Sequence, residues 1–337
     1  MWTQADASAQ DTGASPTLGL TAPSKTLPCA PDQRGKAQLV AIRPNFHTVT
    51  GTLSGFDPCH AKVKFRLPEG VQRPALMISI HGGGGMIDVI RSDEAFHRLG
   101  LATLAFDAYE MNGFEGRDSL FWARQVTNEA RQRMLLTTAW AAYQWALQRS
   151  DIDTHRIFLF GISNGAAVAT QLSAMVSPQH VRAIIAEGVT PIGLGWPDEV
   201  RVPLFLAFGR LDNFGAAQSD MWRWKLTAPC RLNIEFPLSP PGTQRWCNQR
   251  SAGEQQIPTV LQWAAPLQAQ GRPIEIAYFD DMAHSAFFGP LRLDTARWGN
   301  GEWLHSSLGA TPEARERFMK AMLEFMGRHD PTTQQAR

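Results

Sequence analysis

Two kinds of apolar pattern alternate along the chain, and together they predict a layered α/β fold. Six short runs are almost continuously apolar, as expected for strands that are buried on both faces of a parallel sheet. These runs are residues 74–82, 101–109, 156–163, 181–189, 203–212 and 273–281. Three earlier runs, 38–46, 48–53 and 61–67, are separated only by turn residues, which favours antiparallel strands.

Longer segments with helical spacing lie between and after these runs. Residues 124–149 repeat apolar side chains every three or four positions, and residues 312–328 do the same with Phe318, Met322 and Phe325. Thr311 before Pro312 is typical of a helix start. Strands that alternate with helices predict a mostly parallel central sheet with an antiparallel N-terminal edge and helices on both faces.

Length and composition are consistent with one large α/β domain. The chain has 337 residues, of which 44% are hydrophobic and 19% charged, as in a globular protein with a sizeable core. Residues 1–28 are rich in Ala, Ser, Thr, Gly and Pro and predict a flexible leader or processing remnant, so the domain is expected over 29–330. A net charge of +1 gives no reason to expect nucleic acid as a partner, and no apolar run is long enough to cross a membrane.

Four cysteines bear on the cellular compartment. Cys29, Cys59, Cys230 and Cys247 contain no C-x-x-C pair, so a zinc site is not expected, and their even number permits two disulfides in three connectivities. Pairing in sequence order, Cys29 with Cys59 and Cys230 with Cys247, would cross-link the N-terminal strands and a later loop. Because Cys247 lies in a polar, loop-like stretch, disulfides and a periplasmic or secreted location are favoured; four reduced thiols in a cytoplasmic enzyme are the alternative.

The sequence Gly161-Ile162-Ser163-Asn164-Gly165 stands where a predicted strand turns into a helix. This is the G-x-S-x-G pattern of a nucleophile elbow, in which the serine backbone is strained and glycines avoid collisions on either side. The turn would hold the Ser163 hydroxyl clear of the sheet. A turn serine that merely caps the following helix is the alternative.

A serine hydroxyl needs a base, and the base needs an orienting acid. His284 follows the last predicted strand, and Asp212 ends the strand run 203–212, which gives the chain order Ser, Asp, His that this fold class uses. Asp220 and the Asp280/Asp281 pair compete with Asp212 as the acid; they are interpreted as a helix residue and turn carboxylates.

A run of four glycines, residues 82–85, ends an early strand and predicts an oxyanion-binding loop. One backbone N–H from Gly83 or Gly84, together with the N–H of Asn164, would bind the developing negative charge. The run lacks the Lys-Ser/Thr ending of a phosphate-binding loop. His81 is expected to hold this loop through hydrogen bonds to the backbone.

With these features in order on a parallel sheet, residues 60–328 resemble the α/β-hydrolase superfamily. Within it, the stretches 63–85, 101–113, 209–212 and 278–287 are most similar to the dienelactone hydrolase family. The resemblance implies hydrolysis of esters or lactones without a cofactor or metal, with Ser163 as nucleophile, Asp212 as acid and His284 as base. Two departures are a serine where many members use cysteine, and a lid-like insertion at about 214–258.

Aromatic and acidic side chains near the same sheet edge are candidates for substrate binding. Tyr109 and Glu110 end the strand run 101–109, and Glu187 is a weaker candidate. The insertion supplies further candidates for an aromatic-lined cleft, namely Trp222, Trp224 and Trp246. These tryptophans could equally pack the insertion against the core.

The leading hypothesis is therefore a serine hydrolase that cleaves small-molecule or polymeric carboxylic esters, or lactones, through an acyl-enzyme. A peptidase or an acyltransferase on the same triad is the alternative, and a non-catalytic binding protein on a hydrolase scaffold is a third hypothesis. The sequence leaves the oligomeric state open.

Overall fold

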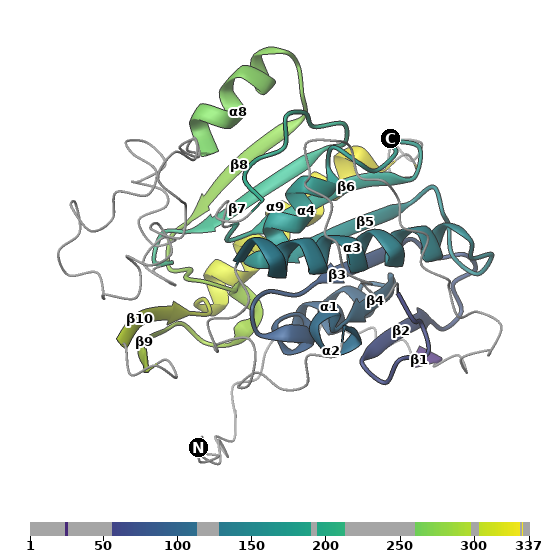
Figure 1. The fold of residues 1–337 in the computed structure, drawn as a ribbon, viewed down its shortest axis with the longest axis horizontal. Helices are drawn as coiled ribbons and strands as arrows, with labels where there is room; N and C mark the ends of the chain where they lie inside the picture. The colour runs from purple at the N-terminus through teal and green to yellow at the C-terminus, as the bar shows by residue number, and fades with distance from the viewer. Residues whose placement is uncertain are drawn as a thin grey trace.

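The computed structural model describes residues 24–25, 56–112, 128–189, 194–212, 260–297, 303–330 and 332. The predicted strands 38–46 and 48–53 and the insertion at about 214–258 lie outside these ranges. The described residues form one large sheet with helices on both of its faces, and a separate two-stranded sheet (Figure 1).

The central sheet has eight strands in the order β1-β2-β4-β3-β5-β6-β7-β8. Strands β3 to β8 pair in parallel, whereas β2 pairs antiparallel with β4 and β1 pairs antiparallel with β2. The strands are β1 (Ser24–Lys25), β2 (Val63–Pro68), β3 (Leu76–Ile80), β4 (Ala102–Phe106), β5 (Ile157–Ile162), β6 (Val181–Glu187), β7 (Leu204–Gly209) and β8 (Ile274–Phe279). The predicted parallel sheet with an antiparallel N-terminal edge is confirmed.

One short stretch of the predicted leader belongs to this sheet. Ser24 and Lys25 pair with Pro68 and Leu67 and so extend the antiparallel edge by one strand. These two residues of the predicted flexible leader therefore form an edge strand, and the rest of residues 1–28 lies outside the described residues. Composition indicated no strand there because a two-residue edge strand needs no apolar periodicity; its backbone groups pair with β2.

The helices form two layers, and alternate residues of the strands pack against each. Leu76 and Ile78 of β3 belong to a core cluster with α3 (Asn128–Leu147), α4 (Asn164–Leu172) and α8 (Val260–Ala269). Met77, between them, belongs to a second cluster with α1 (Ile90–Arg98) and α9 (Pro312–His329). Figure 1 shows α3 and α4 crossing in front of the sheet. The continuous apolar runs are thus explained by burial on both faces.

The remaining elements connect and extend these layers. They are the 3-10 helices η2 (Gly85–Asp88) and η3 (Ala286–Phe288), the short helix α2 (Ala108–Met111), and an antiparallel pair formed by β9 (Arg292–Arg297) and β10 (Trp303–Leu308). The β9–β10 pair was not predicted from the sequence. The Thr311 side chain accepts a hydrogen bond from the N–H of Ala314 at 3.2 Å, which confirms the predicted cap of α9. Among the described helices, none combines the length and apolar character that crossing a bilayer requires.

Candidate active site

Ser163 occupies a strained turn between β5 and α4. Its backbone has φ 55° and ψ −116°, a conformation that is costly for a residue with a side chain. A Cβ on Gly161 would collide with the carbonyl of Gly165, and a Cβ on Gly165 would collide with the carbonyl of Ile80, so both flanking positions require glycine. The Ser163 side chain makes no capping hydrogen bond to α4, which argues against the alternative of a helix-capping serine.

Asp212 and His284 form a buried hydrogen-bonded pair. The Nδ1 atom of His284 lies 2.8 Å from Oδ2 of Asp212, and the two residues are 5% and 2% exposed. Asp212 follows β7 and His284 follows β8, and the N–H of Leu211 donates to the carbonyl of Met282 at 3.0 Å, which ties the two loops together. Because Nδ1–H donates to the carboxylate, Nε2 is left as the basic nitrogen of the neutral ring.

The electrostatics of this pair favour a basic histidine. Burial disfavours the charged imidazolium, but the charge and hydrogen bond of Asp212 outweigh burial and raise the pKa of His284. A carboxylate that stabilises the imidazolium is what a general base requires during catalysis.

The end of β6 connects the elbow with the Asp212–His284 pair. The N–H of Ser163 donates to the carbonyl of Glu187 at 3.0 Å. The next residue, Gly188, lies against both members of the pair: a Cβ there would be 3.0 Å from Nδ1 of His284 and 3.3 Å from Oδ2 of Asp212. The three residues predicted as a triad are therefore gathered at one edge of the sheet, around the end of a single strand.

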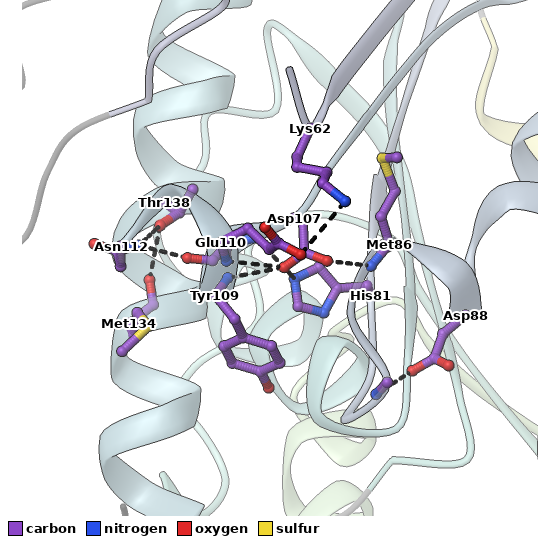
Figure 2. Close-up of polar contacts among 12 residues, drawn as sticks. Lys62, His81, Met86, Asp88, Asp107, Tyr109, Glu110, Asn112, Met134 and Thr138 are labelled. Atoms are coloured by element: carbon purple, nitrogen blue, oxygen red, sulfur yellow. Dashed lines mark hydrogen bonds and ion pairs between the residues drawn. The ribbon is translucent and has the colours of Figure 1, made fainter. Parts of the chain in front are cut away.

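His81 holds the glycine loop as predicted. Its Nδ1 lies 2.7 Å from the carbonyl of Gly82, and its Nε2 accepts the N–H of Ala108 at 2.9 Å (Figure 2). An imidazole that donates from one nitrogen and accepts at the other is neutral. His81 is fully buried and links the loop after β3 to the start of α2.

Asp107 holds the same loop from the neighbouring strand. One oxygen of its carboxylate accepts the N–H of Met86 at 2.9 Å, and the other caps α2 by accepting the N–H groups of Tyr109 and Glu110 at 3.1 and 3.2 Å (Figure 2). A Cβ on Gly85 would collide with this carboxylate. Asp107 was not identified from the sequence, although an aspartate directly after a buried strand and before a helix is a recognisable cap signal.

The amide of Gly84 is engaged inside the loop. It donates to Oδ2 of Asp88 at 2.6 Å (Figure 2), so Gly84 does not direct its N–H at a ligand in this conformation. The expectation that Gly84 supplies an oxyanion donor is corrected on this ground. Within the described part of the chain, no hydrogen bond of the Gly83 amide is seen, which leaves Gly83 as the candidate donor from this loop.

Asn164, the first residue of α4, is held by a side-chain bridge. Its Oδ1 accepts from Nε2 of Gln132 at 3.1 Å, while Oε1 of Gln132 accepts the N–H of Leu194 at 2.9 Å. Gln132 is fully buried on α3. This bridge fixes the elbow against α3 and the loop after β6. This bridge was not predictable from the sequence, because a lone glutamine in a helix is ordinarily solvated.

The two predicted rim residues, Tyr109 and Glu110 of α2, differ in their surroundings. Tyr109 is 8% exposed, and its ring packs edge-on against His81 with the centroids 4.8 Å apart. Glu110 is partly exposed, and its carboxylate lies 3.4 Å from Nζ of Lys62, the residue before β2 (Figure 2). Glu110 is thus directed to the antiparallel edge of the sheet, whereas Tyr109 packs against the histidine that holds the glycine loop.

Several predicted residues cannot be compared with the structure. Trp222, Trp224, Trp246, Cys29, Cys230 and Cys247 lie outside the described residues. Cys59 is described, and its N–H donates to the Asp57 carboxylate at 2.9 Å. The disulfides, and the location inferred from them, stay predictions. In the described ranges, no group of three or more His, Cys, Asp or Glu side chains could hold a metal ion.

Comparison with known sequences gives short matches to two proteins. No family model matches the chain. Two uncharacterized proteins of Mycobacterium tuberculosis, MT2364 of strain CDC 1551 / Oshkosh and Rv2307c of strain H37Rv, are each 33% identical over 109 residues. That match covers 32% of this chain and 34% of each relative, so the aligned part spans about a third of the length of the curated relatives.

Similar solved structures include several hydrolases. A putative dienelactone hydrolase from Klebsiella pneumoniae has 15% identity and a TM-score of 0.48, with 78% of this chain and 91% of that chain covered. A dienelactone hydrolase-like promiscuous phosphotriesterase, P91, from metagenomic libraries has 14% identity and a TM-score of 0.47 over 80% and 94%. Est1E from Butyrivibrio proteoclasticus has 13% identity and a TM-score of 0.38 over 66% and 84%.

The fold class follows from the chain's own geometry. A mostly parallel sheet carries a strained serine elbow after β5, an acidic residue after β7 and a histidine after β8, in the chain order of the α/β hydrolases. This chain has the α/β-hydrolase fold.

Proposed function

We propose that this protein is a serine hydrolase that cleaves carboxylic esters or lactones through an acyl-enzyme intermediate. The observation that carries the proposal is the strained Ser163 at the same sheet edge as the buried Asp212–His284 pair. A strained backbone in a non-glycine residue persists only where the surrounding structure enforces it, and such strain clusters at functional sites. The unused capping capacity of the Ser163 side chain leaves its hydroxyl for chemistry.

The proposed reaction assigns one role to each group. Nε2 of His284 takes the proton of the Ser163 hydroxyl as its oxygen attacks the substrate carbonyl, and the resulting imidazolium is stabilised by Asp212. The tetrahedral oxyanion is bound by the N–H groups of Asn164 and Gly83. His284 then protonates the leaving alcohol, and a water molecule, deprotonated by the same histidine, hydrolyses the acyl-enzyme.

The choice of substrate class has a different basis from the mechanism. The proposal of esters and lactones as substrates rests on the resemblance to dienelactone hydrolases. A peptidase or an acyltransferase would use the same triad and the same steps, with another leaving group or another acceptor. A panel of matched ester, amide and thioester substrates, with and without an alcohol acceptor, separates these reactions. We expect esters to have the highest kcat/KM.

The test of the mechanism is Ser163→Ala, measured with short p-nitrophenyl esters. We expect kcat to fall by ~10⁴-fold or more, because the nucleophile is removed while the fold is kept. Ser173→Ala is the matched control: Ser173 ends the same helix, at the far end from Ser163, and its hydroxyl donates to the carbonyl of Thr170 at 2.6 Å, so this variant should retain activity. Labelling of the parent, but not of Ser163→Ala, by a fluorophosphonate identifies the nucleophile. Unchanged turnover in Ser163→Ala would rule out the proposed function.

A further inference from the structure

Glu187 is a buried carboxylate that the proposed reaction does not use. It is the last residue of β6 and is 1% exposed. One oxygen accepts the N–H of Ala286 at 2.5 Å, whereas Oε2 has no hydrogen-bond partner among the described residues. Burying a carboxylate that has a single hydrogen bond costs free energy of folding, so the presence of a glutamate at this position calls for a physical reason.

The position of Glu187 links the two halves of the candidate site. Its main-chain carbonyl accepts the N–H of Ser163, and the residue after it, Gly188, contacts the ring of His284. Its side chain binds Ala286, two residues after His284. Glu187 therefore contacts both the elbow that carries the nucleophile and the loop that carries the histidine.

Arg315 binds the same loop from the opposite side. Its Nε donates to the carbonyl of Ala286 at 2.8 Å, and its Nη2 donates to the carbonyl of Ala310 at 3.2 Å. Glu187 holds the amide of Ala286 while Arg315 holds its carbonyl, so the residue at the start of η3 is fixed at both of its peptide groups. The loop between β8 and η3 is consequently anchored by a pair of opposite charges.

The charges around Glu187 come from three elements: His284 after β8, Asp212 after β7 and Arg315 on α9. Burial raises the pKa of Glu187 to about 7; the N–H of Ala286, His284 and Arg315 work against this shift, and Asp212 adds to it. In turn, burial lowers the pKa of His284, whereas Asp212, then Glu187, then Asp88 on η2 raise it, so that the pKa is raised on balance. The charges of Glu187 and His284 are therefore coupled.

We propose that Glu187 is a positioning residue for His284: it holds the histidine loop through the amide of Ala286 and, when ionised, serves as a second negative partner for the imidazolium formed during catalysis. The inference rests on the proposed function for its catalytic part. The mutual influence of Glu187 and His284 also exists in the resting protein and can be measured without substrate.

Glu187→Gln separates charge from shape, because glutamine keeps an oxygen that can accept from Ala286. Loss of the negative charge should lower the pKa of His284, so the acid limb of the kcat/KM profile should move to lower pH. We expect kcat to fall by about 10-fold, since the imidazolium loses one neighbouring charge. Glu187→Ala also removes the tie to Ala286 and should lose more activity than Glu187→Gln.

The readout that is independent of activity is the downfield proton resonance of His284 Nδ1–H, followed against pH in the parent and in Glu187→Gln. We expect its titration to move to lower pH in the variant. Asp330→Asn is the control: it removes a carboxylate bound to Arg156 beside the start of β5, at the opposite end of that strand from Ser163, and should leave the titration in place.

A titration of His284 that is the same in the parent and in Glu187→Gln would overturn the proposal, whatever the rates. Equal losses in Glu187→Gln and Glu187→Ala, with the acid limb unmoved, would overturn it as well, because neither the tie to Ala286 nor the charge would then act on His284. Failure of the proposed function would give a different result, namely hydrolysis that survives in Ser163→Ala. The His284 titration would still report whether the charge of Glu187 acts on His284.

Discussion

Gly188 lies directly against the imidazole of His284. A Cβ at Gly188 would be 3.0 Å from Nδ1 and 3.1 Å from Cε1 of the ring, and 3.3 Å from Oδ2 of Asp212. Gly188 also has a φ of +59°, which favours glycine for a second reason. The hydrogen bond between Asp212 and His284 therefore depends on a residue without a side chain at the end of β6.

Gly188→Ala should damage activity more than stability. The added methyl group would displace the imidazole by a few tenths of an ångström. Because a 1 Å misplacement of a reacting group can cost ~100-fold in rate, we expect a loss of up to about that size. The measurement is kcat with a short ester, alongside the thermal midpoint.

Gly271→Ala is the matched control for Gly188→Ala. Gly271 has φ +79° and no atom within 4 Å of its built Cβ, so alanine there brings the backbone strain without the collision. Both variants should lose ~1 kcal/mol or more of stability from the left-handed backbone, but only Gly188→Ala should lose activity. Equal activity in the two variants would contradict the proposed packing.

Asp212→Asn should lower kcat by ~10⁴-fold, because a neutral amide neither stabilises the imidazolium nor enforces the Nδ1–H tautomer. The exposed Asp280, which pairs with Arg210 at 2.8 Å, is the control carboxylate near the same loops. Asp280→Asn should keep nearly full activity on the same ester. A large loss in Asp280→Asn together with an active Asp212→Asn would move the role of the acid to another residue.

Asp107→Asn should impair the glycine loop while sparing the helix cap. Asparagine keeps one oxygen for the N–H groups of Tyr109 and Glu110, but its NH₂ group cannot accept from Met86. If Gly83 supplies an oxyanion donor, loss of loop position should lower kcat toward the ~100-fold cost of a lost donor.

Asp57→Asn is the corresponding control for the loop. Asp57 accepts the N–H of Cys59 in a turn before β2, so the substitution changes a similar aspartate outside the site. It should leave kcat unchanged. An Asp107→Asn variant with parental kcat and an unchanged thermal midpoint would show that the hydrogen bond between Asp107 and the N–H of Met86 has no role in catalysis.

The Arg156–Asp330 pair should make the free energy of unfolding depend on pH in the acid range. Burial alone would raise the pKa of Asp330, but hydrogen bonds from Arg156, the shortest at 2.7 Å, and from Thr332 outweigh it and lower that pKa. A carboxylate whose pKa is lowered on folding stabilises the fold above its ordinary pKa, and this contribution is lost as pH falls through the lower, folded value.

Urea denaturation of the parent and of Asp330→Asn at several pH values tests this relationship. At pH 7 the variant should be less stable by ~1–3 kcal/mol, the usual effect of a lost hydrogen bond to a charged group. The difference should shrink toward zero as both proteins are acidified below the folded pKa of Asp330. A difference that stays constant with pH would show that the carboxylate charge does not contribute.

Local patterns were enough to predict the elements that later position the site. Each of the six continuously apolar runs contains a strand of the parallel sheet, because burial on both faces leaves little room for polar residues. The strained turn at Ser163 was predictable because its requirement for glycine at 161 and 165 is local. The same runs also located Asp212 and His284, since polar residues just beyond parallel strands gather at one edge.

The network that holds these residues was not predictable from local patterns. Glu187, Gln132 and Asp107 contact groups 99, 32 and 21 residues away in sequence, and the residues next to each of them do not indicate these distant partners. Gly84 illustrates the converse: its glycine run predicted an available donor, but the fold brings the Asp88 carboxylate onto its amide.

The sequence by itself determined the sheet, its helices and the chain order of Ser163, Asp212 and His284, because apolar periodicity and turn sterics act over a few residues. Tertiary structure alone decided which groups meet at the carboxyl edge: that Gly188 makes room for the imidazole, and that the Glu187 carboxylate binds the loop that follows His284. Burial and proximity between distant segments, which set the charge and hydrogen bonding of these groups, arise only when the strands pair and the loops pack.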